Sequence, residues 1–406
     1  MQFVRYTGLV LLSLVIWLLV AQYLLCPQYR FTEPEPFHGA YLYNPYQNLV
    51  QGRWIQCNFH AHTNAWNGIT NGRGSAEDLF RRYQELGYTV HAVSEYEKID
   101  TTGRQQPSYV AAYEHGYNAT KTHQLVLGAS RVCWPDFLFP QSRANKQWML
   151  NQLSADPGVV VELNHPVVRN GYTARDMAYL AGYQCIEVLN PAGRSFSLWD
   201  AALSAGKPVF ATGNDDTHNV FDQGSLGRFC TWLYVDTLSQ AYLLRSLREG
   251  KGYAMEVGSA DRTSLTSPLL RACELRGDTL LIRLNRPADR IEFTGQHGKT
   301  LAVVCRADQA AYRIRREDNY VRTSLHFADG TSLYLNPVFR YGGDAQGLFY
   351  SSAPIVDGPR TLVLYALGYF LLALWLFILL RKTPVVRRFR RPARPRPSLP
   401  QGVLPG

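Results

Sequence analysis

The sequence predicts an α/β domain followed by a small all-β domain, with an apolar helix on either side of the pair. Short apolar runs alternate with helical stretches from Arg53 to about Val257, which is typical of an α/β domain with a mainly parallel sheet. Strand-like runs separated by turn residues, with no helical pattern, occupy about residues 258–350. Two uncharged apolar stretches, Gly8–Cys26 and Thr361–Leu380, flank these regions.

Each of the two apolar stretches is long enough to cross the hydrocarbon core of a bilayer. A cleaved signal peptide is the alternative for the first, but its apolar core is long and no small-x-small cleavage site precedes Pro27. A buried core helix is the alternative for the second, and its length and basic flank argue against that. We therefore expect transmembrane helices within residues 1–26 and 361–380.

The basic tail, residues 381–406, supplies most of the formal net charge of +10. By the positive-inside rule it places the C-terminus in the cytoplasm, and two spans then place the N-terminus there too. The globular part, residues 27–360, is expected on the extracytoplasmic side. Because that part is nearly neutral, the high pI does not indicate nucleic-acid binding. The Pro and Arg content predicts a disordered tail.

The expected strands of the α/β region are RWIQCNF, TVHAVS, QLVLGASRV, GVVVEL, QCIEVLN and KPVFATG. The expected helices, SAEDLFRRYQELG, TARDMAYLAG and SLWDAALSAG, each begin at a capping residue and end at a glycine. A barrel and an open sheet both fit this alternation. The later runs, such as TLLIRL, RIEFTG and YVRTSLHFA, predict a β-sandwich comparable with immunoglobulin-like modules.

Two histidines stand at the end of the first expected strand. His60 and His62 follow RWIQCNF, and residues i and i+2 of a strand face the same side. Both rings therefore project to one face at the strand's C-terminal end, where the active sites of α/β folds form. The pair can supply two ligand atoms to a metal ion, although an isolated pair of histidines is more often not a metal site.

Further titratable residues follow other expected strands. Asp216 and His218 come after KPVFATG, and a carboxylate with an imidazole is a usual ligand set for zinc, manganese or iron. Asp215 is assigned to a helix N-cap or a turn. His165 follows the buried run VVVEL, and Glu114 in YEHG is expected in a loop ahead of the next strand. Together these residues predict a metal site at the strand ends.

Taken in order, these clusters resemble the polymerase and histidinol phosphatase (PHP) superfamily over about residues 50–257. The resemblance implies a distorted β/α barrel with metal ions at its strand ends. FHAHT is similar to the family's opening H-x-H, Glu114 to its bridging glutamate, and His165-Pro166 to its later H-P; the closing D-x-H is Asp216-Thr217-His218. The implied metal ligands are His60, His62, Glu114, His165, Asp216 and His218.

Three positions depart from the family pattern. An acid expected soon after H-x-H is Asn67, a Thr-Asp-His motif reads Ser94-Glu95-Tyr96, and a histidine expected after QLVLGA is Ser130. One metal position keeps a full set of ligands, so we expect one or two divalent ions, zinc, manganese or iron. Glu95 is an alternative ligand or a solvated loop acid, and Tyr96 is an aromatic wall or a phosphate contact.

Three basic residues are candidate anion contacts or plain surface charges: Lys98, Arg169 and Arg194.

The resemblance implies a membrane-anchored phosphoesterase that hydrolyses a phosphate ester by metal-activated water. His165 or His218, where not bound to metal, would protonate the leaving oxygen. The substrate would be a phosphorylated small molecule or an envelope component, and no nucleic acid. Two alternatives stay open: a degenerate pocket that binds an anion without turnover, and an envelope-structural protein whose β-sandwich binds glycan or protein. No G-x-S-x-G, P-loop or G-x-G-x-x-G motif supports a serine hydrolase, NTPase or dehydrogenase.

Overall fold

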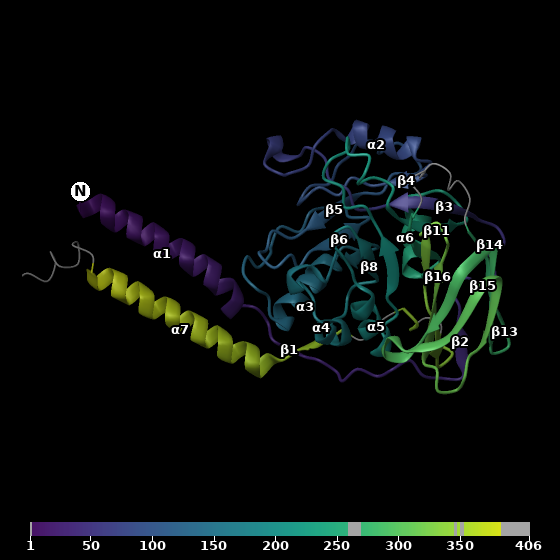
Figure 1. Ribbon diagram of the computed structural model, residues 1–406. Helices are drawn as coiled ribbons and strands as arrows, with labels where there is room; N and C mark the ends of the chain where they lie inside the picture. Colours follow the sequence, from purple (N-terminus) through teal and green to yellow (C-terminus); the bar gives the residue numbers. More distant parts are fainter. Residues whose placement is uncertain (1, 259–268, 345–346, 350–352, 383–406) are drawn as a thin grey trace, which may run out of the picture. The chain divides into compact units, whose positions relative to one another are not determined.

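The structure, a computed structural model, describes residues 2–258, 269–344, 347–349 and 353–382. The chain divides into two compact units (Figure 1). One unit is Tyr29–Val356, and the other combines Met1–Gln28 with Asp357–Gly406. Each unit is described by itself below.

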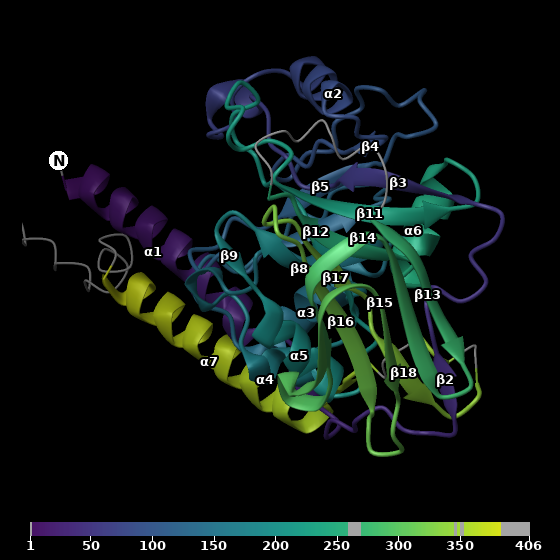
Figure 2. The ribbon, with the colours of Figure 1, turned by 45° about the vertical axis from the view of Figure 1, so that its right-hand side comes forward.

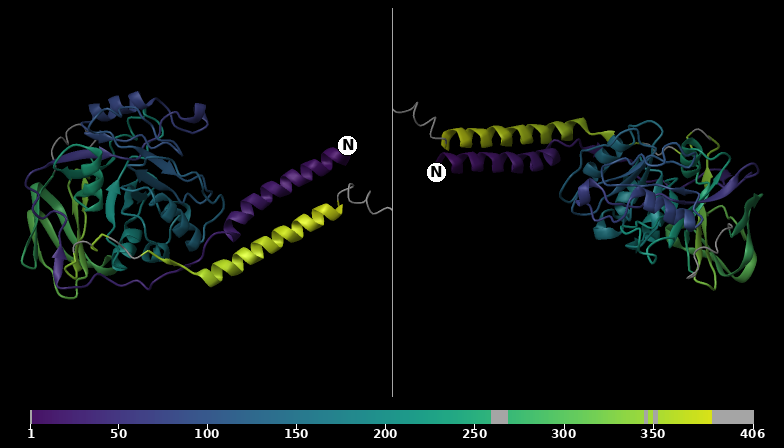
Figure 3. Two further views of the ribbon diagram at one scale, coloured as in Figure 1. Left: turned by 180° about the vertical axis from the view of Figure 1, so that it is seen from behind. Right: turned by 90° about the horizontal axis from the view of Figure 1, so that it is seen from above.

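The smaller unit is a pair of helices, α1 (Gln2–Leu24) and α7 (Gly358–Lys382). Both are long and apolar enough to cross a membrane by length and composition, and little of either is buried. The N–H of Gln28 donates to Thr361 Oγ1, and its carbonyl accepts from the N–H of Asp357. The end of α1 therefore meets the beginning of α7, and the helices run antiparallel, side by side (Figure 3).

The first sheet of the larger unit has the strand order β10 (Phe210–Gly213), β8 (Cys185–Asn190), β7 (Val160–Leu163), β6 (Gln124–Leu127), β5 (Ala112–His115), with β9 (Gly193–Arg194) beside β8. β10, β8 and β7 are parallel, whereas β6 is antiparallel to both of its neighbours. The expected mainly parallel sheet is therefore mixed. The beginning of β6 lies at the same edge as the ends of β5 and β7.

The second sheet has the order β13 (Leu270–Arg276), β14 (Thr279–Thr294), β16 (Tyr320–His326), β17 (Ser332–Leu335), β12 (Gly252–Glu256), β11 (Phe229–Val235), β3 (Arg53–Asn58), β4 (Val90–His91). The strands β15 (Thr300–Arg313), β18 (Val338–Tyr341) and β2 (Tyr41–Tyr43) join off this path. Figure 2 shows β14 and β15 as a long hairpin. TLLIRL and RIEFTG, expected as two strands, belong to the single strand β14.

The strands of the two expected domains share this sheet, because β12 pairs with β17. Residues 259–268, at the expected domain boundary, lie outside the described residues. The strands β1 (Tyr29–Arg30) and β19 (Ile355–Val356) pair antiparallel and bring the two ends of the larger unit together.

The distorted β/α barrel that the resemblance implies does not close among the described residues. At one seam, β4 and β5 are linked through the isolated bridge between Tyr96 and Glu114. At the other seam, the Thr231 hydroxyl replaces a ladder between β10 and β11, because it accepts from the N–H of Gly213 and donates to its carbonyl. A register shift between Thr212 and Gly213 interrupts β10 at this point. The mixed α/β class is confirmed, and the barrel is corrected to two facing sheets.

The strands of the first sheet contribute to two separate cores. Leu125 and Leu127 of β6 face a core between the sheets, which α6 (Gln240–Arg248) closes through Leu243 and Leu247. The intervening Val126 faces a second core with residues of α3 (Arg143–Leu153), α4 (Ala174–Tyr179) and α5 (Phe196–Ser204). This alternation follows from the two-residue period of a strand. α2 (Ala76–Glu85) begins at the Ser75 cap that the sequence predicts.

Candidate metal centre

The H-x-H and D-x-H segments lie side by side at the ends of their strands. The N–H of Asp216 donates to the carbonyl of His60, and the N–H of His62 donates to the carbonyl of Thr217. Ala61 and Thr217 form a parallel bridge between the two segments. Because side chains alternate along each segment, His60, His62, Asp216 and His218 reach the same space.

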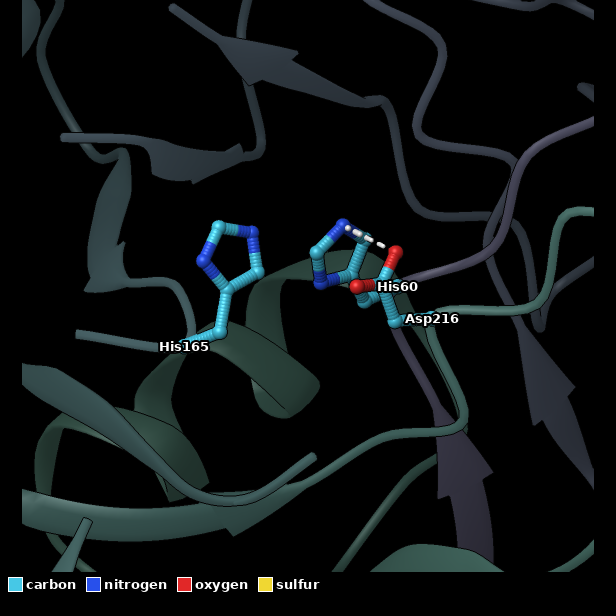
Figure 4. A group of neighbouring side chains, drawn as sticks. All are labelled: His60, His165 and Asp216. Carbon is cyan, nitrogen blue, oxygen red and sulfur yellow. Dashed lines mark ion pairs between the residues drawn. The ribbon is translucent and has the colours of Figure 1, made fainter. Parts of the chain in front are cut away.

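Four side-chain atoms converge there, from His60, His62, Glu114 and Asp216. The two Nε2 atoms of the histidines are 3.2 Å apart. Glu114 Oε2 lies 3.4 Å from His60 Nε2 and 3.1 Å from His62 Nε2. Asp216 Oδ1 lies 3.2 Å from His60 Nε2 (Figure 4) and 3.4 Å from His62 Nε2. An ion with tetrahedral bonds of about 2.0–2.1 Å holds its ligand atoms about 3.4 Å apart, so the spacing within His60, His62 and Glu114 suits a metal ion. Asp216 belongs to a neighbouring group with His60 and His165.

The hydrogen bonding of these groups also suits a metal ion. Glu114 Oε2 and Asp216 Oδ1 are buried and accept no hydrogen bond. A buried carboxylate oxygen without a partner is unfavourable, and a cation bound beside each oxygen would satisfy it. His60 Nδ1 faces Glu187 Oε1 at 3.1 Å, which leaves Nε2 as the ligand atom.

Glu114 connects this group to a second one through its other oxygen. Glu114 Oε1 lies 2.8 Å from His123 Nδ1 and 3.2 Å from His165 Nε2. Glu114, His123 and His165 are all buried, and each offers an atom within 4.8 Å of the others. Glu114 belongs to β5 and not to the expected loop. One carboxylate therefore lies between two sets of imidazoles.

A third group combines His62, Asp216 and His218. His218 Nδ1 faces the carbonyl of Asp216 at 2.9 Å, and the rings of His218 and His62 lie 4.4 Å apart. His218 is the most exposed of the ligand candidates. All six residues that the sequence singles out are thus brought together, and His123 joins them.

His123 is the functional candidate that the sequence analysis missed. The missing histidine was sought after QLVLGA, at Ser130, whereas His123 immediately precedes β6. Ser130 is exposed and bonds to Asp156. The antiparallel direction of β6 explains the error, because the beginning of this strand lies at the site.

The electrostatics of the cluster arise from alternating imidazoles and carboxylates. Burial alone would lower the pKa of His60, but the carboxylates of Asp216, Glu114 and Glu187 raise it well above its ordinary value. Burial also opposes the charge of His62, yet the neighbouring carboxylates of Asp216 and Glu114 raise its pKa to about 9. Burial would raise the pKa of Glu114, but His123 and His60 hold it well below its ordinary range. The Glu114 carboxylate therefore stays ionised and attracts cations.

Two ligand candidates have strained backbones. His165 has φ of 28° and Asp216 has φ of 44°, in a region that residues with a side chain rarely adopt. The N–H of His165 donates to Glu187 Oε2 at 2.8 Å, and the N–H of Asp216 to the carbonyl of His60 at 2.9 Å. Such strain persists where the surroundings fix it, commonly at functional sites.

Glu187 of β8 holds two residues of the cluster in place, His60 and His165. Besides contacting His60 and His165, its carboxylate accepts from Asn190 Nδ2 and Asn214 Nδ2. Asn190 Nδ2 also reaches Asp216 Oδ2 at 3.1 Å. A single acid inside the apolar run QCIEVLN was the available sign of this role.

Several sequence assignments are corrected or refined. Asp215 caps no helix; its carboxylate accepts from the N–H groups of residues 227–229 and from Tyr83 Oη, and holds the loop before β11. Glu95 is buried and accepts from Thr63, so it is no solvated loop acid. The ring of Tyr96 stacks on His62 at 4.5 Å, as an aromatic wall would. Asn67 is exposed, in a short helical turn.

A cavity of about 630 Å³ opens over the cluster and is lined in part by His123, His165, Asp216 and His218. Its lining includes Lys121, whose Nζ lies 5.7 Å from the centre of the Tyr96 ring. The basic residues proposed from sequence do not line it: Lys98, Arg169 and Arg194. Arg194 pairs with Glu256, and Arg169 donates to the carbonyl of Ala119.

No protein family and no curated protein matches this sequence. Among solved structures, the chain is similar to a two-domain protein from Bacteroides vulgatus ATCC 8482 that contains a predicted PHP-like metal-dependent phosphoesterase. The two are 13% identical, and the similarity covers 78% of this chain and 92% of the other, with a TM-score of 0.40. A likeness at this level supports no inference about function, which must come from the geometry of the site.

Proposed function

We propose that this chain is a metal-dependent phosphoesterase. The observation that carries the proposal is the convergence of His60, His62, Glu114 and Asp216 at metal-ligand spacing, with Glu114 shared by a second group. Divalent ions bound there, zinc, manganese or iron, would lower the pKa of bound water and neutralise charge on phosphoryl oxygens. The shared carboxylate favours two adjacent ion positions.

The remaining residues of the cavity have separate tasks in this proposal. Lys121 attracts and orients the anionic phosphate group. Tyr96 covers His62 and excludes water from one side of the cluster. His165 and His218 line the cavity, and either ring can carry a proton to the leaving oxygen where no metal ion holds it.

We further propose that α1 and α7 anchor the chain in a membrane. Their length, their composition and their small buried fraction support this. The basic residues after Arg381 favour a cytoplasmic C-terminus. With two spans, the proposal puts residues 27–360 on the extracytoplasmic side. The substrate is accordingly a phosphorylated small molecule or an envelope component rather than a nucleic acid.

The test is phosphate release from phenyl phosphate by the full chain in lipid nanodiscs. Chelation should abolish turnover, and Zn²⁺, Mn²⁺ or Fe²⁺ should restore it. The variant Glu114→Gln keeps the side-chain shape but removes the shared charge, and added metal should not restore its turnover. Glu77→Gln, at an exposed acid of α2, is the matched control. Turnover that survives chelation, or that persists in Glu114→Gln, would contradict the proposal, and metal binding without turnover would favour a binding protein.

A further inference from the structure

The cavity over the cluster is polar in its depth and apolar at its mouth. Its inner lining carries the histidines and Asp216, whereas Ile69 and Tyr117 lie at its edge with 87% and 52% of their surface exposed. A single exposed apolar side chain is ordinary on a protein surface. Several at the mouth of one cavity indicate a surface that binds an apolar group.

Two tryptophans lie beside the cavity without lining it. The rings of Trp66 and Trp134 meet edge to face with centres 6.1 Å apart, and both are exposed. Trp66 Nε1 donates to the carbonyl of Tyr96 at 2.8 Å, which fixes the ring beside the cavity wall. Asp136, two residues after Trp134, accepts a hydrogen bond from the N–H of Tyr117 at 2.9 Å, which joins the segment of Trp134 to Tyr117. We call this surface the apolar rim, and its members are Trp66, Ile69, Tyr117 and Trp134.

Charge sets the orientation of a ligand in this cavity. Among the lining residues, Lys121 is the lysine and Asp216 the acid, and Asp216 points to the ligand cluster. An anionic group is therefore drawn inward to Lys121, and metal ions held by the ligand candidates would add to this attraction. The rim itself presents aromatic and aliphatic surface, which gains free energy by removing apolar groups from water.

We infer that the site takes phosphate esters whose alcohol is apolar. The phosphate lies on the metal cluster and the alcohol lies on the apolar rim. In the hydrolytic step the water oxygen bonds to phosphorus, the bond from phosphorus to the alcohol oxygen breaks, and that oxygen takes up a proton. The products are an apolar alcohol and inorganic phosphate. This inference rests on the proposed function for its phosphate end.

Binding and turnover test the two parts separately. Calorimetry on the Zn²⁺-loaded full chain in nanodiscs would compare benzylphosphonate with methylphosphonate, which cannot be hydrolysed. We expect benzylphosphonate to bind at least about tenfold more tightly, a difference of about 1.4 kcal/mol. The double variant Ile69→Ser/Trp134→Ser should bring the affinity ratio close to one. Val50→Ser, at an exposed residue of another cavity, should keep the wild-type ratio.

The same samples are assayed with benzyl phosphate and ethyl phosphate, whose leaving alcohols have similar basicity. A wild-type affinity ratio near one, or a double variant that keeps the wild-type ratio, overturns the inference. If the ratio behaves as expected but neither ester is hydrolysed, the apolar rim stands and the phosphoesterase function fails. If the two esters are hydrolysed at equal kcat/KM and the two phosphonates bind with equal affinity, the phosphoesterase function stands and the apolar rim is rejected.

Discussion

Two buried clusters in the larger unit each combine carboxylates with basic side chains. They differ in whether the carboxylate oxygens accept hydrogen bonds. The Asp200 carboxylate accepts hydrogen bonds from Nε and Nη2 of Arg322, each at 2.7 Å, and from the hydroxyl of Tyr320 at 3.1 Å. The Arg322 guanidinium also lies over the ring of Trp199. In the candidate metal centre, by contrast, Glu114 and Asp216 each keep a buried oxygen that accepts no hydrogen bond.

The difference separates a structural ion pair from a ligand set. A planar guanidinium can saturate one carboxylate, so the Asp200 cluster is complete within the chain. In the candidate metal centre two carboxylates each keep an acceptor oxygen beside the imidazoles, and a bound cation would satisfy such an oxygen. Burial and charge alone therefore do not identify a functional site, whereas unsatisfied acceptors that converge do.

The largest expected effect is on the complete cluster. Asp200→Ala leaves Arg322 buried without its partner, and removing one member of a buried pair lowers the free energy of unfolding by about 3–5 kcal/mol. Urea unfolding of the full chain, followed by tryptophan fluorescence, measures this. The metal content of the folded fraction should be unchanged. A loss below about 1 kcal/mol would show that the pair is not the structural element described.

A smaller loss is expected when one ligand is removed from the incomplete cluster. His123→Ala should lower metal-dependent kcat/KM by about 100-fold, the upper end of what outer residues of metal sites contribute. It should also reduce the number of bound ions. Ser130→Ala, the position that the sequence pattern suggested, should leave both quantities at the wild-type level. Equal effects of the two substitutions would remove His123 from the site.

Glu187→Gln tests the support beneath the cluster. The substitution keeps the size of the side chain but weakens its hold on His60 Nδ1 and changes the preferred orientation of that ring. We expect metal affinity to fall by about tenfold, measured by competition with a chromogenic chelator. An affinity equal to that of the wild type would show that Glu187 does not position His60.

The smallest expected effect is that of substituting Glu97. Glu97 shares a feature with each of the two clusters, because only one of its carboxylate oxygens accepts a hydrogen bond. Its Oε1 accepts from the N–H of Gly116, whereas its Oε2 is buried and accepts no hydrogen bond. Burial raises the pKa of Glu97 to about 7. A raised carboxyl pKa stabilises the fold at low pH, and that stability is lost as the pH rises from the unfolded pKa of about 4.5 through 7.

Glu97→Gln removes this titration. Relative to the wild type, its stability should rise by about 1 kcal/mol between pH 6 and pH 7. Urea unfolding at the two pH values measures the change. A difference between variant and wild type that does not vary with pH would show that Glu97 is ionised across the range.

Sequence reasoning reached most of the cluster because local rules govern it. His60 with His62, and Asp216 with His218, follow from the two-residue period of a strand and from the position of active sites at strand ends. His123 did not follow, because the prediction assumed parallel strands and sought ligands only after them. The direction of β6 is decided by long-range pairing with β5 and β7, which the sequence does not display.

The same limit applies to the fold. Apolar runs and helix caps indicated the elements, including α2 with its Ser75 cap. Closure of the sheet depends on single residues at the seams, such as Thr231 and Gly213, whose effect appears only when the strands are adjacent. Lys121 was missed for a related reason: it lies in a loop, and only the fold places it over the cavity.

The central claim is that His60, His62, Glu114 and Asp216 hold a metal ion. The most direct measurement is the metal content of the purified full chain by inductively coupled plasma mass spectrometry, with the wild type beside His60→Ala/Asp216→Ala. The account predicts at least one zinc, manganese or iron ion per wild-type chain and a clear loss in the variant. A wild-type chain without metal after reconstitution, or a variant that retains the full complement, would contradict it.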